Sequence, residues 1–401
     1  MSTIRHVTLA GGFVAAGVKC GIKVSGKNDL AIIAGQRDCA AAVVTTRNQV
    51  FGEPVRYIRK IMPRGFGMVR GIVINSGCSN VCTGPGGFKD AVAMAELTAR
   101  ELGTTAKRVL VASTGIIGHR LPMAKIRAGI AAAAGKLGRD NDTEALHAIM
   151  TTDTRDKYAV VQTRIGGKLV TVGGIVKGSG MIAPSLATMI GVITTDAAVS
   201  PRVLHAALTG AAATTFNAIT VDSDTSTSDT VAVLASGAAL NRAIAAGSKD
   251  FAAFAGALRE VCRNLARAVI VDGEGATKLV EIRVRGARSD AEAFIAAKSV
   301  ADSPLFKTAI HGGDPNWGRI AAALGKSSAK VDPSKLVIAV GGVTIFARGT
   351  GRKFDLKKVE RHLKGKTVFV ACDLGLGSGR AEVLTCDLSR EYIAINADYS
   401  T

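Results

Sequence analysis

Short apolar runs separated by turn-forming residues dominate the beginning of the chain. Residues 15–22, 29–35 and 40–46 read AAGVKCGI, DLAIIAG and AAAVVTT, and Gly, Asn or Asp separates them. Two further runs, GIVINSG at 71–77 and RVLVASTG at 108–115, enclose a segment with helical spacing at 89–102. Runs of this length and composition predict buried strands joined by tight turns, with one helix between the last two.

The middle of the chain predicts both helices and a hairpin. Pro122 introduces a helix over 123–137, and a second helical piece follows at 142–150. Residues 158–178 alternate around a Gly-Gly pair at 166–167, which is typical of a hairpin turn. A strand is expected at 189–199, after which Ser200 and Pro201 fit the N-cap and first position of another helix.

The last third repeats this mixture of elements. A helix is predicted over 249–266, and the spacing of Ser289 and Glu292 predicts a capping box at the start of another. Strands are predicted at 268–273, 279–286, 336–346, 367–374, 381–388 and 391–396. Strands and helices alternate without low-complexity linkers, so we expect two α/β lobes in close contact.

Composition narrows the class of protein. Hydrophobic residues make up 47% of the 401 residues but aromatic ones only 4%, and the net charge is +19. A basic surface attracts anionic substrates, but no run combines basic with aromatic residues, so specific nucleic-acid binding is not expected. The seven cysteines are scattered and odd in number, which favours free thiols. The N-terminal stretch fits neither a signal nor a membrane span, and we expect a cytoplasmic protein.

Familiar hydrolase and metal motifs are absent from the sequence. There is no GxSxG and no HExxH, the histidines are dispersed, and no metal site is predicted. The unusual segment is KGSGMIAPSLATM at 177–189. A tight turn there can bring the Thr188 hydroxyl to the Ala187 carbonyl and permit an N-to-O acyl shift. Hydrolysis would free the Thr188 α-amine, whose pKa near ~8 suits a general base for its own hydroxyl. From the local sequence alone, a structural loop with an ordinary strand threonine is the favoured interpretation, because small residues before a threonine are common.

Motifs along essentially the whole chain decide between these alternatives. AAGVKCGIK, VASTGIIG, MTTDT, KGSGMIAPSLATM, FNAITVDSDTSTSDT, VDGEGATK, GGDPNWGR and CDLSREYIAINADYST occur in this order. With them the chain resembles the ornithine acetyltransferase family, the self-processing glutamate N-acetyltransferases of arginine biosynthesis. The resemblance implies a layered α/β sandwich with two sheets between helices, similar to the self-processing aminopeptidases. It also implies cleavage between Ala187 and Thr188 into an alpha chain, 1–187, with the oxyanion hole and processing loop, and a beta chain, 188–401, forming the C-terminal lobe.

The resemblance assigns roles to particular residues. Thr188 is the implied nucleophile, and Thr114 and Gly115 are the implied oxyanion hole, where such donors stabilise the tetrahedral intermediate. The implied substrate contacts are Thr154, Lys177, Thr188, Glu274, Asn396 and Thr401. Lys177 suits a carboxylate and Glu274 an ammonium or amide. The acidic segment 222–230 is interpreted as a polar loop shaping the site and Trp317 as packing beside it, while Cys78 and Cys82 are interpreted as small apolar fillers.

The implied reaction transfers the acetyl group of N-acetylornithine to glutamate through an acetyl-Thr188 intermediate. The family resemblance implies a heterotetramer of two alpha and two beta chains and no cofactor, with acetyl-CoA open as a second acetyl donor. An alternative is a Thr-nucleophile aminopeptidase or amidase on the same fold. The sequence departs from the usual family text at Cys78, Ser185 and Leu186, which bears on substrate choice and processing rate more than on the chemistry.

Overall fold

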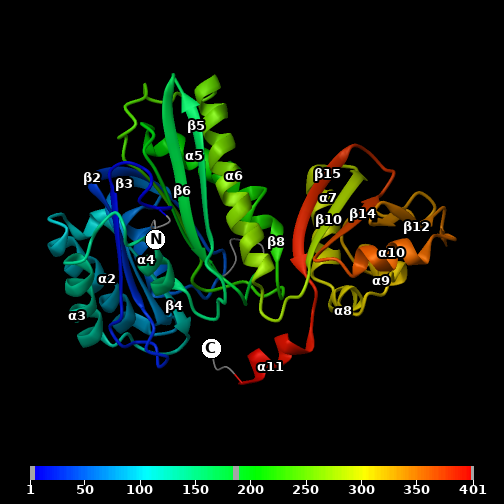
Figure 1. The fold of residues 1–401 in the computed structure, drawn as a ribbon, viewed down its shortest axis with the longest axis horizontal. Helices are drawn as coiled ribbons and strands as arrows, with labels where there is room; N and C mark the ends of the chain where they lie inside the picture. The colour runs from blue at the N-terminus through cyan, green and yellow to red at the C-terminus, as the bar shows by residue number, and fades with distance from the viewer. Residues whose placement is uncertain (1–4, 184–188, 399–401) are drawn as a thin grey trace.

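Two mixed β-sheets, each carrying helices, form the computed structural model, which describes residues 5–183 and 189–398 (Figure 1). Residues 187, 188 and 401, which carry the predicted cleavage site, nucleophile and terminal substrate contact, lie outside the described residues, as do Ser185 and Leu186. No helix among the described residues is long and apolar enough to cross a membrane.

The first sheet has the strand order β4-β3-β2-β9-β7-β6-β5, with β1 paired to β2. The β3–β4 and β7–β9 pairs are parallel, and the other pairs are antiparallel. The strands are β1 (Phe13–Val18), β2 (Leu30–Thr45), β3 (Phe66–Cys78), β4 (Val109–Ile116), β5 (Tyr158–Ile165), β6 (Lys168–Lys177), β7 (Ile190–Thr195) and β9 (Thr230–Ala235).

Helices cover both faces of this sheet, which is why its central strands are apolar on both sides. On one face α5 (Pro201–Ala213) and α6 (Lys249–Val271) share a core with β6, β7 and β9. On the other face α4 (Asp142–Ile149) packs on β1 and β2. The β3–β4 end also carries α1 (Glu53–Ile61), α2 (Gly84–Glu101), the short 3-10 helix η1 (Ala106–Arg108) and α3 (Met123–Ala134).

The second sheet has the order β13-β12-β11-β14-β10-β15-β8. In β10, Val280, Ile282 and Val284 are buried, whereas Arg283 and Arg285 are exposed, so only one face packs on a core. Its strands are β8 (Ile219–Thr220), which follows the 3-10 helix η2 (Phe216–Ala218), β10 (Leu279–Ala287), β11 (Val337–Val340), β12 (Val343–Ala347), β13 (Thr350–Gly351), β14 (Thr367–Asp373) and β15 (Gly379–Cys386).

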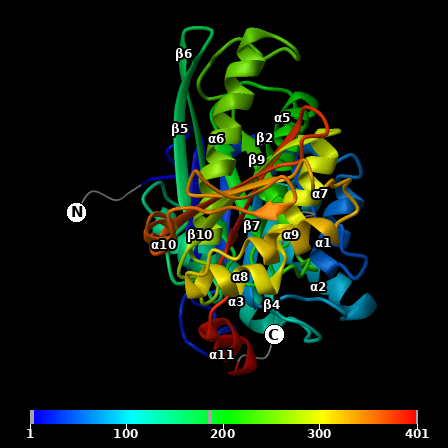
Figure 2. The same cartoon turned by 90° about the vertical axis from the view of Figure 1, so that its right-hand side faces the viewer.

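The helices of the second sheet are α7 (Asp290–Ala301), α8 (Pro304–Gly312), α9 (Trp317–Gly325) and α10 (Leu356–Leu363). Helix α6 contacts β5 and β6 of the first sheet and β15 of the second, so it lies between the two sheets. The predicted layered α/β class is therefore confirmed. The last helix, α11 (Arg390–Asp398), has no buried residue and lies below both sheets in Figures 1 and 2.

The division between the sheets does not coincide with the predicted division at residue 187. Strands β6 and β7 lie on either side of that point and pair with each other, with Lys177 opposite Ile190. The first sheet therefore contains β7 and β9 from the second segment, and only β8 and residues after 278 build the second sheet. The cleavage boundary itself stays a prediction, but residues 188–401 are not a separate lobe.

Two predicted strands are helical in the structure. Residues 268–271 continue α6, because Leu265, Val269 and Ile270 extend the buried stripe of that helix at helical spacing. Residues 391–396 belong to α11. Their alternating pattern suits a strand, but the chain has already left the sheet after β15, and no strand in the described part of the chain pairs with them.

Several smaller predictions can also be compared with the structure. The hairpin of β5 and β6 turns at Gly166–Gly167 as predicted. The Ser200 side chain caps α5 by accepting the backbone N–H of Val203, and the Ser289 side chain caps α7 by accepting that of Glu292. The seven cysteines are free, but Cys82 is exposed, so its interpretation as an apolar filler is wrong.

Candidate active site

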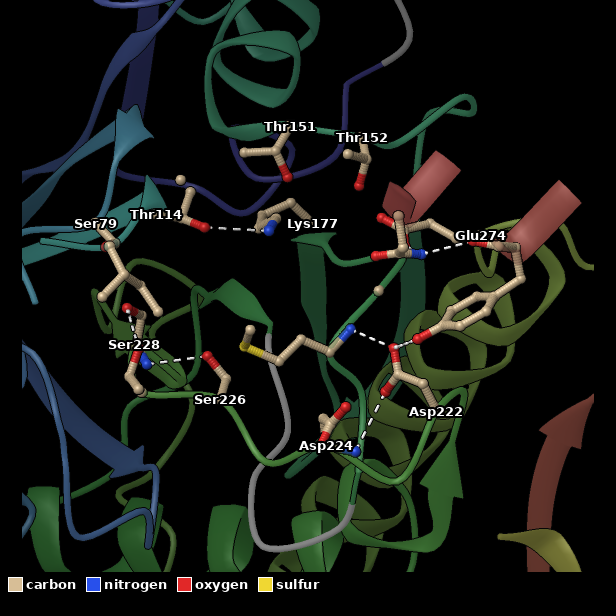
Figure 3. Close-up of a pocket in the computed structure, with 17 residues that line it drawn as sticks. Ser79, Thr114, Thr151, Thr152, Lys177, Asp222, Asp224, Ser226, Ser228 and Glu274 are labelled. Carbon is tan, nitrogen blue, oxygen red and sulfur yellow. Dashed lines mark hydrogen bonds between the residues drawn. The ribbon is translucent and has the colours of Figure 1, made fainter. Parts of the chain in front are cut away.

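A cavity of about 240 Å³ lies where the ends of β4 and β6 meet the loop after β8 and helix α11 (Figure 3). Segments far apart in the sequence therefore contribute to one site. The residues that line it are Ser79, Thr114, Gly115, Ile117, Thr151, Thr152, Lys177, Gly180, Met181, Asp222, Asp224, Ser226, Thr227, Ser228, Glu274, Tyr392 and Asn396.

Thr114 and Gly115 reach the cavity from the end of β4, beside the parallel strand β3. Gly115 has a φ of 123°, and a Cβ atom there would lie only 2.4 Å from the carbonyl carbon of Gly77. Only glycine fits this close approach of two backbones. Two residues earlier in β4, Ser113 Oγ donates to Oδ1 of Asn75 in β3 at 2.6 Å, which links the two strands near their ends. The end of β4 is thus held rigidly against β3.

Lys177 ends β6 with its ammonium in the cavity, although its side chain is almost wholly buried. Its Nζ donates to Thr114 Oγ1 at 3.2 Å. Because an ammonium can only donate, Thr114 is the acceptor, and the hydroxyl proton of Thr114 stays free to be donated to another group. Burial lowers the pKa of Lys177, and Asp153 is the main group opposing that effect.

A buried charge network lies behind Lys177. Lys157 Nζ donates to Asp153 Oδ1 at 2.6 Å and also to Asp272, and all three side chains are buried. Burial alone would raise the pKa of Asp153, but the ammonium groups of Lys157 and Lys177 hold it at about 2. Asp153 also accepts the Gly178 N–H at 2.7 Å. The network thereby fixes the chain immediately after Lys177.

Thr154, a predicted substrate contact, belongs to this network in the structure. Its backbone N–H and its hydroxyl both donate to Asp272, and it does not line the cavity. The neighbouring Thr151 and Thr152 do line the cavity (Figure 3). A substrate contact for Thr154 stays a prediction.

The opposite side of the cavity is acidic. Glu274 accepts a hydrogen bond from Asn396 Nδ2 of α11 at 2.9 Å, so two predicted substrate contacts lie together. A Cβ atom on Gly180 would lie 2.3 Å from the Glu274 carboxylate, which shows how closely the glycine-rich loop approaches it. Figure 3 shows Lys177 and Glu274 on different sides of the cavity. This separation of charge suits a small ligand with both an anionic and a cationic end.

Asp222 connects the glycine-rich loop to the C-terminal helix. Its carboxylate accepts the backbone N–H groups of Met181 at 2.5 Å and Ile182 at 2.8 Å, and the Tyr392 hydroxyl at 3.4 Å. Burial raises the pKa of Asp222 to about 6 despite these backbone donors. The interpretation of residues 222–230 as a polar loop shaping the site is confirmed, because five of them line the cavity.

Asp229 holds the chain just past the predicted nucleophile. Its Oδ1 accepts the Met189 N–H at 3.0 Å, and Thr230 donates its N–H to the Met189 carbonyl at 3.1 Å.

Among the described residues no group of three or more His, Cys, Asp or Glu side chains could hold a metal ion.

Sequence reasoning both missed and misplaced residues at this site. Tyr392 stands in the quoted motif CDLSREYIAINADYST but was not singled out, and its segment was predicted to be a strand. Thr151 and Thr152 stand in the quoted motif MTTDT and were not singled out either. Trp317 does not line the cavity: it packs on Phe346 with ring centroids 5.0 Å apart, in the second sheet. Its predicted place beside the site is wrong, because the turn before it starts α9.

Comparison with known proteins gives consistent matches. The model of the ArgJ family matches residues 14–401. The arginine biosynthesis bifunctional protein ArgJ of Symbiobacterium thermophilum is 46% identical over 400 residues, covering 98% of each chain.

Solved structures match as well. The ArgJ bifunctional protein of Bacillus halodurans, at 40% identity and a TM-score of 0.50, covers 51% of this chain and 97% of its own. The ornithine acetyltransferase of Mycobacterium tuberculosis, solved with ornithine, is 43% identical with a TM-score of 0.40, covering 46% of this chain and 96% of its own. The resemblance predicted from the motifs is confirmed, and the chain belongs to the ArgJ family.

Proposed function

We propose that this enzyme cleaves its own chain between Ala187 and Thr188 and then transfers the acetyl group of N-acetylornithine to glutamate through an acetyl-Thr188 intermediate. The observation that carries the proposal is the pairing of Lys177 with Thr114 beside Gly115, across the cavity from Glu274. One small cavity therefore has hydrogen-bond donors that suit an oxyanion and opposite charges that suit an amino acid, which supports the proposal.

The transfer proceeds in two balanced steps. The Thr188 oxygen attacks the acetyl carbon of N-acetylornithine, the amide C–N bond breaks, and the departing ornithine amine takes the hydroxyl proton by way of the α-amine of Thr188. The uncharged amine of glutamate then attacks the acetyl ester, and its proton returns to the Thr188 oxygen. In both steps the free hydroxyl proton of Thr114 and the Gly115 N–H stabilise the oxyanion.

The charged side chains orient the substrate. Lys177 receives a carboxylate and Glu274 an ammonium, and Asn396 fixes the Glu274 carboxylate by donating to it. The C-terminal Thr401 and Thr154 complete the proposed set of substrate contacts. No cofactor is required for these steps, and acetyl-CoA is a further candidate donor for the first of them.

The lengths of the solved relatives support self-cleavage. The Bacillus halodurans chain is matched over 97% of its own length but covers only 51% of this one. A cut after residue 187 lies near the middle of the 401 residues and leaves chains of comparable length. The cleaved chains stay together because β6 and β7 pair across the cut, and we propose that two such pairs form the heterotetramer.

Intact mass measured under denaturing conditions tests the cleavage, and a transfer assay tests the reaction. Two fragments that sum to the 41.2 kDa chain plus one water, the second beginning at Thr188, are expected. Acetate release without a glutamate requirement would instead establish the amidase alternative. An uncut, inactive chain would refute the proposal.

A further inference from the structure

Asp229 is a wholly buried carboxylic acid at the point where the chain resumes after the proposed nucleophile. Its Oδ1 accepts the Met189 N–H at 3.0 Å, and its backbone carbonyl accepts the N–H of Thr46, the residue after β2, at 3.1 Å. Asp229 therefore connects the first residue after position 188 to the end of a strand of the first sheet. No other described side chain is bonded to the backbone N–H of Met189.

The second oxygen of this carboxyl group is anomalous. Oδ2 is buried and makes no hydrogen bond of good geometry among the described residues, although the hydroxyls of Ser226 and Thr46 lie close to the carboxyl group; the only comparable side-chain atom in this part of the chain is Thr98 Oγ1 in α2. Buried polar atoms are nearly always paired, and an unpaired one costs about 1 to 3 kcal/mol. A leucine in this place would avoid the unpaired polar atom but could not accept the Met189 N–H, so the carboxyl group is explained by that hydrogen bond and not by stability.

Burial disfavours the charged form of this acid. Desolvation raises the pKa of Asp229 well above its usual value, and the Met189 N–H, the Lys177 ammonium and the hydroxyls of Ser226 and Thr46 oppose that effect only in part. Lys177 is the charged group that faces it. Burial therefore favours the uncharged form of this acid, although a cation lies nearby.

The charge of this group matters for the residue next to Met189. A free α-amine serves as a general base only in its uncharged form, and a carboxylate close to it would stabilise the ammonium instead. An uncharged acid can hold the backbone in the same place without that effect.

We propose that Asp229 is a positioning residue that works as an uncharged acid: it anchors the chain at Met189 so that the nucleophile keeps its place and its α-amine stays available as the base. This inference rests on the proposed function, because it assumes that residue 188 is the processed nucleophile.

Two substitutions separate anchoring from ionisation. Asp229→Asn keeps an uncharged acceptor for the Met189 N–H, so we expect complete cleavage and a kcat within about threefold of the wild type. Asp229→Ala removes the acceptor, and we expect slow cleavage and a kcat about 100-fold lower, as is typical of a displaced reacting group. The pH dependence of kcat/KM should be the same for the wild type and the asparagine variant.

Asp142→Asn is the matched control. Asp142 is also buried and accepts backbone N–H groups, those of His6 and Thr8 at 3.1 Å each, but these belong to the N-terminal segment and not to the chain at Met189. We expect this variant to cleave itself and to turn over like the wild type. Its behaviour shows what the loss of a buried carboxylate costs away from the site.

The outcomes are distinguishable. If the wild type neither cleaves itself nor transfers acetyl groups, the proposed function fails. If the wild type does both and Asp229→Asn is as impaired as Asp229→Ala, or Asp229→Ala is unimpaired, only this inference fails. Should the alanine variant not fold, the pH profiles decide: a limb present in the wild type and absent from Asp229→Asn would mean that Asp229 ionises and would overturn the inference.

Discussion

Replacing Thr114 by valine removes the hydroxyl from the proposed oxyanion hole while keeping the shape of the side chain. In the structure this hydroxyl accepts from Lys177 Nζ at 3.2 Å, so its own proton is free to be donated to substrate. Thr114 is only 4% exposed, and water cannot readily replace the lost donor. The valine variant therefore tests one hydrogen bond in the transition state.

The size of the effect follows from this geometry. Loss of one oxyanion donor lowers kcat by about 100- to 1000-fold, or about 3 to 4 kcal/mol. The ammonium of Lys177 also loses its partner, which costs about 1 to 3 kcal/mol. That second cost falls on the folded state and on substrate binding, because it is present before the transition state forms. We therefore expect the loss to be larger in kcat than in the denaturation midpoint.

Initial rates of acetyl transfer, measured after intact mass has shown how far each variant is cleaved, check this expectation. Thr114→Ser is the control, because it keeps the hydroxyl and loses only a methyl group, and we expect a kcat within about tenfold of the wild type. A fully cleaved Thr114→Val enzyme with wild-type kcat would refute the oxyanion role. Equal losses in the serine and valine variants would show that packing, not the hydroxyl, matters.

Three further predictions concern the surroundings of the cavity. Lys157→Met leaves the buried Asp153 and Asp272 without their cation, and a urea titration should show the folded state weakened by about 3 to 5 kcal/mol; an unchanged midpoint would contradict this. Burial raises the pKa of Asp222 to about 6 in the folded state, so its protonated form contributes stability that is fully present below the pKa of Asp222 in the unfolded chain. This contribution is lost as the pH rises through about 6. Asp222→Asn should remove this decrease, and parallel titrations at pH values on both sides of that window test it. A Cβ on Gly275 would lie 2.4 Å from the backbone at the start of α11, so Gly275→Ala should displace that helix, seen as faster limited proteolysis of the C-terminus and a raised KM.

The sequence predicted best those helices and hairpins that short-range contacts decide. The apolar spacing predicted α3 and the β5–β6 hairpin, because short-range packing and turn chemistry decide these elements. The same kind of evidence was wrong for residues 268–271 and 391–396. In both places the chain could satisfy either pattern locally, and contacts with distant elements or their absence decided the outcome.

The candidate site shows the same division. The sequence by itself determined the family, through long motifs in a fixed order, and with it Thr114, Gly115, Lys177, Glu274 and Asn396, all of which line one cavity. It gave no sign that Thr154 hydrogen-bonds to Asp272 or that Asp229 lies beside Met189. Burial, hydrogen-bond partners and pKa shifts depend on which distant residues meet, and only the tertiary structure decides that.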